Sequence, residues 1–335
     1  MKKLINDPMA FVDETIEGVL AAYPGYLKRC AGSKRALMRT DGPVAGKVAI
    51  VTGGGSGHIP VFLGYVGPGL LDAVSIGNVF SSPSPDDMLA ATRAAHGGAG
   101  VLHLYGNYSG DVMNFGMAAE MAEMEDIEVA TVLARDDVVS APVAEMDRRR
   151  AVAGLVFAYK IAGARADEGA DLAGVVAAAE HAAVNTRSMG VALTPCTIPA
   201  AGEPTFTLGE NEMELGMGIH GEPGLRRSQI MPVDDVVDEI MENVLGDLPF
   251  ASGDEVAVLV NGLGATPPEE LFLMYRRTKA ILDDAGIAVH RALVGEYATS
   301  MEMAGASVSL LKLEGDLKRL LDAPAYSPFL PQWPR

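Results

Sequence analysis

Residues 47–60 read KVAIVTGGGSGHIP, a short β-branched run followed by a segment with four glycines and a histidine. An apolar run bounded by glycine predicts a buried strand that ends in a tight loop. Glycine has no side chain, so the backbone at Gly55, Ser56 and Gly57 could approach a ligand closely and present its N–H groups. A strand that runs into such a loop is typical of α/β domains, in which ligands bind beyond the carboxyl ends of strands.

The glycine loop does not match the two common nucleotide-binding patterns. The GxGxxG spacing fails because His58 stands where the third glycine should be, and no Lys-Ser or Lys-Thr pair follows to complete a Walker A motif. A nicotinamide dehydrogenase therefore fits the α/β class but lacks its fingerprint. His58 could take part in proton transfer beside a bound ligand, or it could cap a helix, and the local sequence leaves both interpretations open.

Strands and helices alternate on both sides of this unit. In the N-terminal half we expect strands at 73–76, 100–105 and 127–133, and helices at 11–22, 85–95 and 111–125. Alanine-rich helices at 151–162 and 171–185 and a loop at 194–224 follow. Beyond them we expect helices at 234–244 and 267–285, strands at 256–261, 287–294 and 306–313, and an extended strap from 323. The pattern predicts two α/β domains, 1–190 and 191–335, with mixed or parallel sheets flanked by helices.

Two further loops hold polar residues at sites where ligands could bind. Asp111 follows Gly106-Asn107-Tyr108-Ser109-Gly110 at an expected helix start, so it is either an N-cap or a carboxylate that accepts a proton from a substrate hydroxyl. His220 lies among glycines and a proline, so it is either a solvated loop residue or a nucleophile held in a cleft. Neutral imidazole could add to a carbonyl carbon to give a hemiaminal.

Composition excludes several classes of function. The net charge of −18 repels nucleic-acid backbones and anionic membranes, and no apolar run is long enough to span a bilayer. The two cysteines, Cys30 and Cys196, are far apart, which fits a reducing, cytoplasmic compartment. His58, Asp111 and His220 could together bind zinc, but no HxH or HxxxH pair supports a metal, so we expect none.

At these loops the sequence resembles the substrate-binding subunit of dihydroxyacetone kinases. The resembling segments span nearly the whole chain: 1–7, 43–49, 53–58, 107–111, 114–115, 197–202, 211–214, 218–224 and 261–267. The resemblance implies two α/β domains with a small ketose bound between them. It identifies His220 as the residue that bonds to the carbonyl carbon, Asp111 as the base for the terminal hydroxyl, and His58 as a hydrogen-bonding partner that shares the acid–base work. It also implies that Gly55, Ser56, Gly57 and Gly106 belong to the substrate-binding region.

The resemblance further implies that the phosphoryl donor lies on another protein. We expect no cofactor on this chain; ATP or ADP with Mg²⁺ would sit on a separate helical nucleotide-binding subunit. A homodimer is also implied. An alternative from the same family is a ketose sensor that acts through a regulatory protein, but a sensor needs no base, so His58 and Asp111 favour catalysis.

Two positions depart from the family pattern. Ile59 stands where the family usually has Glu, and Gly106 stands where a Lys is common. Loss of two long side chains could open the pocket. We therefore keep two substrates as alternatives, dihydroxyacetone and the four-carbon ketose erythrulose.

Overall fold

The first half of the chain forms a mixed six-stranded sheet in the order β1-β2-β4-β3-β5-β6. The computed structural model describes residues 2–330. The strands are β1 (Leu27–Arg29), β2 (Ala36–Arg39), β4 (Ala73–Val79), β3 (Ala49–Ser56), β5 (Val101–Gly106) and β6 (Val129–Ala134). The four strands from β4 to β6 are parallel, and β2 and β1 add antiparallel. Because parallel strands end at one edge, the loops after β3 and β5 lie together.

Helices cover both faces of this sheet. Helices α2 (Pro85–Ala95) and α3 (Ser109–Glu123) pack on one face, where Met88, Phe115 and Ala118 join Val51 and Tyr105 in one hydrophobic cluster. Ser84 caps α2 as its sequence predicts, since its Oγ accepts the N–H of Asp87 at 3.2 Å. Helix α1 (Phe11–Ala22) and the short 3₁₀ helix η1 (Leu63–Tyr65) belong to the core on the other face.

The second half forms another six-stranded sheet in the order β11-β10-β12-β7-β8-β9. Its strands are β11 (Ala288–Gly295), β10 (Glu255–Gly262), β12 (Ala304–Lys312), β7 (Thr186–Thr194), β8 (Glu212–Leu215) and β9 (Arg226–Gln229). Only β10 and β11 are parallel. Helices α6 (Val233–Asp247) and α7 (Pro268–Asp284) pack on one face, where their apolar side chains join Val258, Val260 and Val308.

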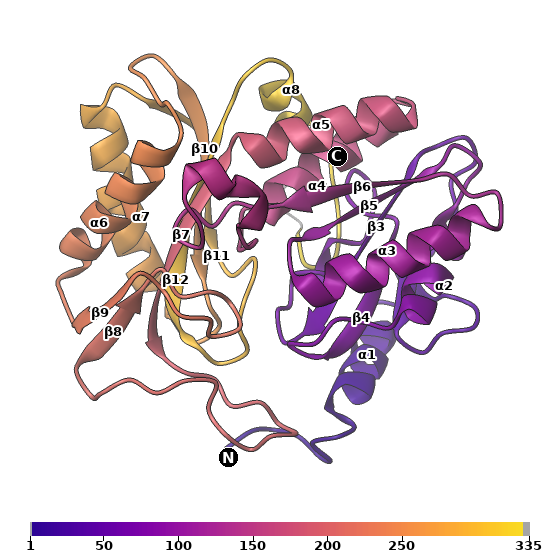
Figure 1. The fold of residues 1–335 in the computed structure, drawn as a ribbon, viewed down its shortest axis with the longest axis horizontal. Coiled ribbons are helices and arrows are strands. Elements are labelled where there is room, and N and C mark those ends of the chain that lie inside the picture. The colour runs from indigo at the N-terminus through magenta and orange to yellow at the C-terminus, as the bar shows by residue number, and fades with distance from the viewer. Residues whose placement is uncertain (1, 331–335) are drawn as a thin grey trace.

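Helices α4 (Leu155–Asp167), α5 (Leu172–Val184) and α8 (Leu317–Asp322) lie between the two sheets (Figure 1). Nearly every side chain of α4 is buried, and Phe157 and Tyr159 share one hydrophobic cluster with Leu259 and Leu311 of the second sheet. A helix that is apolar all round must be covered all round. The alanine-rich sequence of α4 therefore fits its place between two sheets.

The two α/β halves confirm the predicted fold class, but the strand inventory differs from prediction. Strands β1, β2, β7, β8 and β9 were not expected, and β8 lies inside the segment predicted to be a loop.

Glycines 53–55 continue β3 instead of leaving it. A Cβ on Gly53 would lie 2.5 Å from Ser75 Oγ, and one on Gly54 would lie 2.2 Å from the Phe62 ring. These glycines permit close packing within the sheet. The division between residues 190 and 191 stays a prediction; β7, which begins at Thr186, already belongs to the second sheet.

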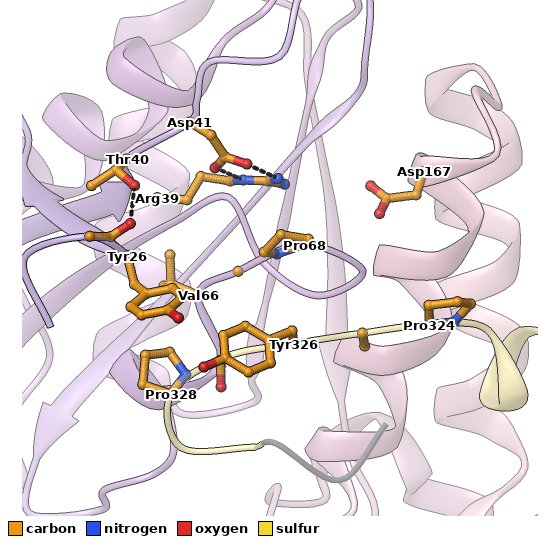
Figure 2. A pocket seen from close by; sticks show the side chains of 14 residues that line it. Tyr26, Arg39, Thr40, Asp41, Val66, Pro68, Asp167, Pro324, Tyr326 and Pro328 are labelled. Atoms are coloured by element: carbon orange, nitrogen blue, oxygen red, sulfur yellow. Dashed lines mark hydrogen bonds and ion pairs between the residues drawn. The ribbon is translucent and has the colours of Figure 1, made fainter. Parts of the chain in front are cut away.

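The described part of the tail, up to residue 330, packs as the expected strap, and its last five residues lie outside the described ones. The Tyr326 N–H donates to Pro68 O at 2.9 Å, which ties the strap to the first half. A cavity of about 460 Å³ lies beside the strap, and the ring centroids of Tyr26 and Tyr326, two of its lining residues, are 5.3 Å apart. Figure 2 shows the side chains that line it. Arg39 binds Asp41 there through two nitrogens, at 2.6 and 2.8 Å.

Candidate active site

The three predicted loops converge at the junction between the two halves. His58 follows β3, Asp111 lies in the first turn of α3 after β5, and His220 lies between β8 and β9. The segment 299–301, after β11, links the loops: the Met301 N–H donates to Gly57 O at 2.8 Å, and the Ser300 hydroxyl donates to Ile219 O. The His58 and His220 rings lie edge to face with centroids 4.8 Å apart. Residues 162 positions apart in the sequence (220 minus 58) thus share one site.

His58 is fully buried and held in one tautomer. Its Nδ1 lies 2.7 Å from the carbonyl oxygen of Thr299, and a carbonyl can only accept, so Nδ1 holds the proton. The other nitrogen, Nε2, has no hydrogen-bond partner within residues 2–330. Burial, and secondly the nearby charge of His220, together lower the pKa of His58 to about 3. At neutral pH His58 therefore offers a free, neutral acceptor nitrogen.

His220 is held at two points by Glu222. One carboxylate oxygen accepts the backbone N–H of His220 at 2.9 Å, and the other accepts the ring Nδ1–H at 2.8 Å. Burial alone would raise the pKa of Glu222, but the hydrogen bond and the charge of His220 outweigh burial and lower it to about 2. Because Glu222 stays ionised and holds the Nδ1 proton, the Nε2 lone pair of His220 remains available as a nucleophile.

Aromatic rings surround the His220 side chain, which is 22% exposed. The Tyr108 ring lies 4.7 Å away, edge to face, and the Phe80 ring lies 5.4 Å away while it stacks on His58 at 4.9 Å. Phe80 and Met301 both have positive φ, at 55° and 53°. Such conformations are strained for residues with a Cβ and gather at functional sites. The rings shield much of the His220 side chain from water.

Asp111 is a buried carboxyl group whose Oδ1 finds no hydrogen-bond partner in the described chain. Burial raises its pKa to about 6, although a hydrogen bond from Ser82 and the charge of His220 both oppose the shift. Asp111 makes no side-chain cap at the start of α3, where Tyr108 is the N-cap residue. A buried carboxylate with one unpartnered oxygen suits proton transfer better than helix capping.

Arg150 anchors the His220 loop to the first half of the chain. Its guanidinium binds Asp137 at 2.8 Å and donates to Gly216 O at 3.4 Å. The neighbouring residue Ala151 accepts a hydrogen bond from the Tyr108 hydroxyl at 2.7 Å. The segment around residue 150 therefore ties the Asp111 loop to the His220 loop.

The glycines predicted to bind substrate differ in what surrounds them. A Cβ on Gly55 would lie 2.6 Å from the Ser81 nitrogen, and one on Gly57, at φ +103°, would lie 2.8 Å from the Phe80 ring. Ser56 is buried, and its carbonyl accepts the Phe80 N–H at 3.0 Å. These three residues thus set the position of Phe80 beside the histidines. Whether they also bind substrate stays a prediction.

The two departures from the family pattern lie in different places. Ile59 lines a small cavity beside α1, with Val12, Thr15 and Ile16. A Cβ on Gly106 would lie 3.0 Å from Ala151 Cβ and 3.3 Å from the Tyr108 ring, which packs on His220. Of the two departures, position 106 is therefore the one at which a longer side chain would press on the Tyr108 ring beside His220.

The sequence analysis did not identify Glu222, Tyr108, Phe80 or Arg150. A carboxylate two residues after a glycine-flanked histidine is the signal that could have found Glu222. The aromatic residues gave no such signal, because their role depends on tertiary contacts. Within residues 2–330, no group of three or more His, Cys, Asp and Glu side chains is arranged to hold a metal ion, and no helix is both long and apolar enough to cross a bilayer.

Comparison with known proteins identifies the family to which the chain belongs. Residues 17–329 match the model of the Dak1 domain. The chain belongs to the Dak1 domain family. It is 46% identical to the dihydroxyacetone-binding subunit DhaK of the PTS-dependent dihydroxyacetone kinase 2 from Listeria innocua, over 98% of this chain and 99% of that protein.

Other relatives of this Dak1 domain chain differ in their named substrates. It is 43% identical to the D-erythrulose kinase of Mycolicibacterium smegmatis, over 98% of this chain but 56% of that enzyme. Among solved structures, the C. freundii dihydroxyacetone kinase in complex with AMP-PNP and Mg²⁺ superposes with a TM-score of 0.87 at 33% identity, covering 99% of this chain and 61% of that one. The dihydroxyacetone kinase operon co-activator Dha-DhaQ superposes with a TM-score of 0.86 at 30% identity, covering 93% and 96%.

Proposed function

We propose that this chain is the ketose-binding subunit of a kinase and that it holds the ketose covalently on His220. The observation on which this rests is the pair of hydrogen bonds that Glu222 accepts from His220, one from the backbone N–H and one from the ring. The second keeps the ring proton on Nδ1, so that the Nε2 lone pair is available beside His58. The Listeria relative, named as a dihydroxyacetone-binding subunit, matches along nearly its full length.

The covalent step is an addition without a leaving group. The Nε2 lone pair of His220 bonds to the ketone carbon while the carbon–oxygen π pair moves to oxygen, which takes up a proton. The ring releases its Nδ1 proton through Glu222 to solvent, so the hemiaminal contains every atom of the ketose. Glu222 offsets the positive charge that the ring develops, and polyols without a carbonyl group cannot react in this way.

The carboxylate of Asp111 then accepts the proton of the terminal hydroxyl as the hydroxyl oxygen attacks phosphorus. His58 Nε2 accepts a hydrogen bond from the substrate and orients it. Phosphoryl transfer depends mainly on positioning and charge stabilisation, so a fixed ketose and a buried base are what a binding subunit needs to supply.

The phosphoryl donor is proposed to sit on a separate helical nucleotide-binding subunit, as ATP with Mg²⁺ that either exchanges from solution or is regenerated from bound ADP by a phosphotransfer relay. The C. freundii kinase whose structure contains AMP-PNP and Mg²⁺ is a longer chain, of which this chain spans 61%. This chain's part in that chemistry would be to hold the hydroxyl in place with Asp111. A cytoplasmic homodimer is the form that the family resemblance implies.

Erythrulose is the second candidate substrate, and Gly106 favours it. A Cβ at position 106 would lie 3.3 Å from the Tyr108 ring, so a longer side chain there would displace that ring towards His220. Glycine avoids this displacement, which favours a pocket that accepts one more carbon. Three kinases named for erythrulose are 41–43% identical, although the chain spans 56–58% of their length.

A phosphorylation assay tests the proposed function and separates the substrates. The chain is mixed with the other components of the Listeria innocua dihydroxyacetone kinase 2 system and offered dihydroxyacetone, D-erythrulose, L-erythrulose or glycerol. We expect phosphorylation of at least one ketose and none of glycerol. A kcat/KM at least as high for erythrulose would support the role of Gly106, whereas strong preference for dihydroxyacetone would refute it. Binding without any turnover would favour the sensor role.

A further inference from the structure

The exposed side of the first turns of α3 is uncharged and apolar. Val112, Met113 and Met117 are 39%, 61% and 47% exposed, and Gly116 lies between them on the same side of the helix. We call these four residues the α3 face. From residue 107 to residue 119 the only charged residue is Asp111, which is buried. A contiguous exposed apolar surface without a charged side chain is a candidate contact site.

Gly116 has no structural reason to be glycine within the described part of the chain. A Cβ built there would meet nothing within 4 Å, and Gly116 is not among the glycines at positive φ. Glycine in the middle of a helix weakens it relative to alanine. A glycine at such a position permits the close approach of a surface from outside.

The α3 face adjoins the position of the reacting hydroxyl. Asp111, the proposed base, lies in the first turn of α3, one residue before Val112. In Figure 1 the helix lies across the near face of the first sheet, with one end toward the second half of the molecule. In-line transfer requires the donor phosphate to reach a hydroxyl held at Asp111, so the protein that brings the donor must cover this end of α3.

We propose that the α3 face is the docking surface for the subunit that carries the phosphoryl donor, and that Gly116 allows that subunit to approach the helix backbone. This inference rests on the proposed function. The partner is a protein with a complementary apolar patch beside its nucleotide site. Methionine side chains are flexible and polarisable, which suits a contact that forms and separates in every catalytic cycle.

Substitutions along α3 test the proposal with a control on the same helix. Gly116→Arg and Met113→Glu place a bulky or charged group on the face, and Met124→Glu makes a like change at the far end, where Met124 is 79% exposed. The donor components of the Listeria innocua dihydroxyacetone kinase 2 system are titrated against each variant, and the concentration that gives half-maximal phosphorylation is measured. Adduct formation without the donor is followed by intact-protein mass spectrometry.

We expect the half-maximal concentration to rise at least about tenfold for Gly116→Arg and Met113→Glu and less than about twofold for Met124→Glu, where tenfold is 1.4 kcal/mol of binding free energy. Adduct formation should be unchanged in all three. Gly116→Ala should raise the melting temperature, since nothing inside the molecule opposes a methyl group there. If Met113→Glu and Met124→Glu changed the half-maximal donor concentration equally while the unsubstituted chain turned over normally, the docking surface would be wrong and the proposed function would stand. Absence of turnover by the unsubstituted chain would instead overturn the proposed function.

Discussion

His58 and His220 lie side by side, yet their surroundings give them opposite chemistry. His58 is fully buried, donates Nδ1–H to a backbone carbonyl and has a pKa lowered by burial to about 3. His220 is partly exposed and donates Nδ1–H to a carboxylate. A carbonyl partner fixes the tautomer without stabilising charge, whereas a carboxylate also stabilises the cation that forms when Nε2 attacks carbon. The partner of Nδ1 thus distinguishes His58, a neutral acceptor, from His220, the proposed nucleophile.

Removing the proposed base, Asp111, should have the largest effect on turnover. Asp111→Asn keeps the shape of the side chain but cannot take a proton, so we expect turnover to fall by about 10²–10⁴-fold. The ketose adduct should persist, because His220 and Glu222 are intact. Steady-state phosphorylation and intact-mass measurements on one preparation check both points. Near-normal turnover would remove Asp111 from the proposed chemistry.

Weakening the carboxylate of the His220 pair should reduce adduct formation. Glu222→Gln keeps a hydrogen-bond acceptor for Nδ1–H but loses the charge, and a hydrogen bond to a charged group contributes about 1.5–3 kcal/mol. We therefore expect the ketose concentration for half-maximal adduct to rise about 10–100-fold. Glu210→Gln, an exposed position just before β8, is the matched control. If the ketose concentration for half-maximal adduct stayed the same, the charge of Glu222 would not be what makes His220 more reactive than His58.

The pKa values of Asp111 and His58 also predict how turnover depends on pH. Turnover should rise with pH through about 6 as Asp111 loses its proton, and it should show no second limb from His58, whose pKa is about 3. A kcat profile from pH 4.5 to 8 checks this. A limb that survives Asp111→Asn would show that another group titrates.

The raised pKa of Asp111 predicts a small effect on stability. The folded pKa, about 6, lies above the usual 3.8, so the folded state binds the proton more tightly and loses stability as pH rises from about 4 to above 6. Asp111→Asn removes that loss and should raise the free energy of unfolding by about 1–3 kcal/mol at pH 8, but not at pH 3.5. Urea unfolding at the two pH values measures the difference.

Local sequence predicted the parts of the fold whose signals are local. The run before Gly53, the Ser84 cap and the amphipathic helices appear as expected. The pairs β1–β2 and β8–β9 are short strands at sheet edges, and β7 follows α5 after a single residue, so no turn signal marks any of them. The glycines at 53–55 were misassigned to a loop because the side chains that crowd them, Ser75 and Phe62, come from other parts of the chain.

The residues of the site were likewise predictable only where their signals are local. His58, Asp111 and His220 each follow or flank a glycine segment, which made them visible in the sequence. The atoms that decide their chemistry are less visible: the carbonyl of Thr299 is 241 residues from His58, and only folding brings it within 2.7 Å. Family resemblance supplied the grouping, and the tautomers come from the structure.

The most direct test is the mass of the chain after incubation with dihydroxyacetone, compared with His220→Ala and with His181→Ala on α5 as a control. The proposed hemiaminal predicts a gain of one whole ketose, with no loss of water, in the unsubstituted chain and in His181→Ala, and no gain in His220→Ala. The same gain in His220→Ala, or a gain short by one water, would contradict a bond between the His220 ring nitrogen and the ketone carbon.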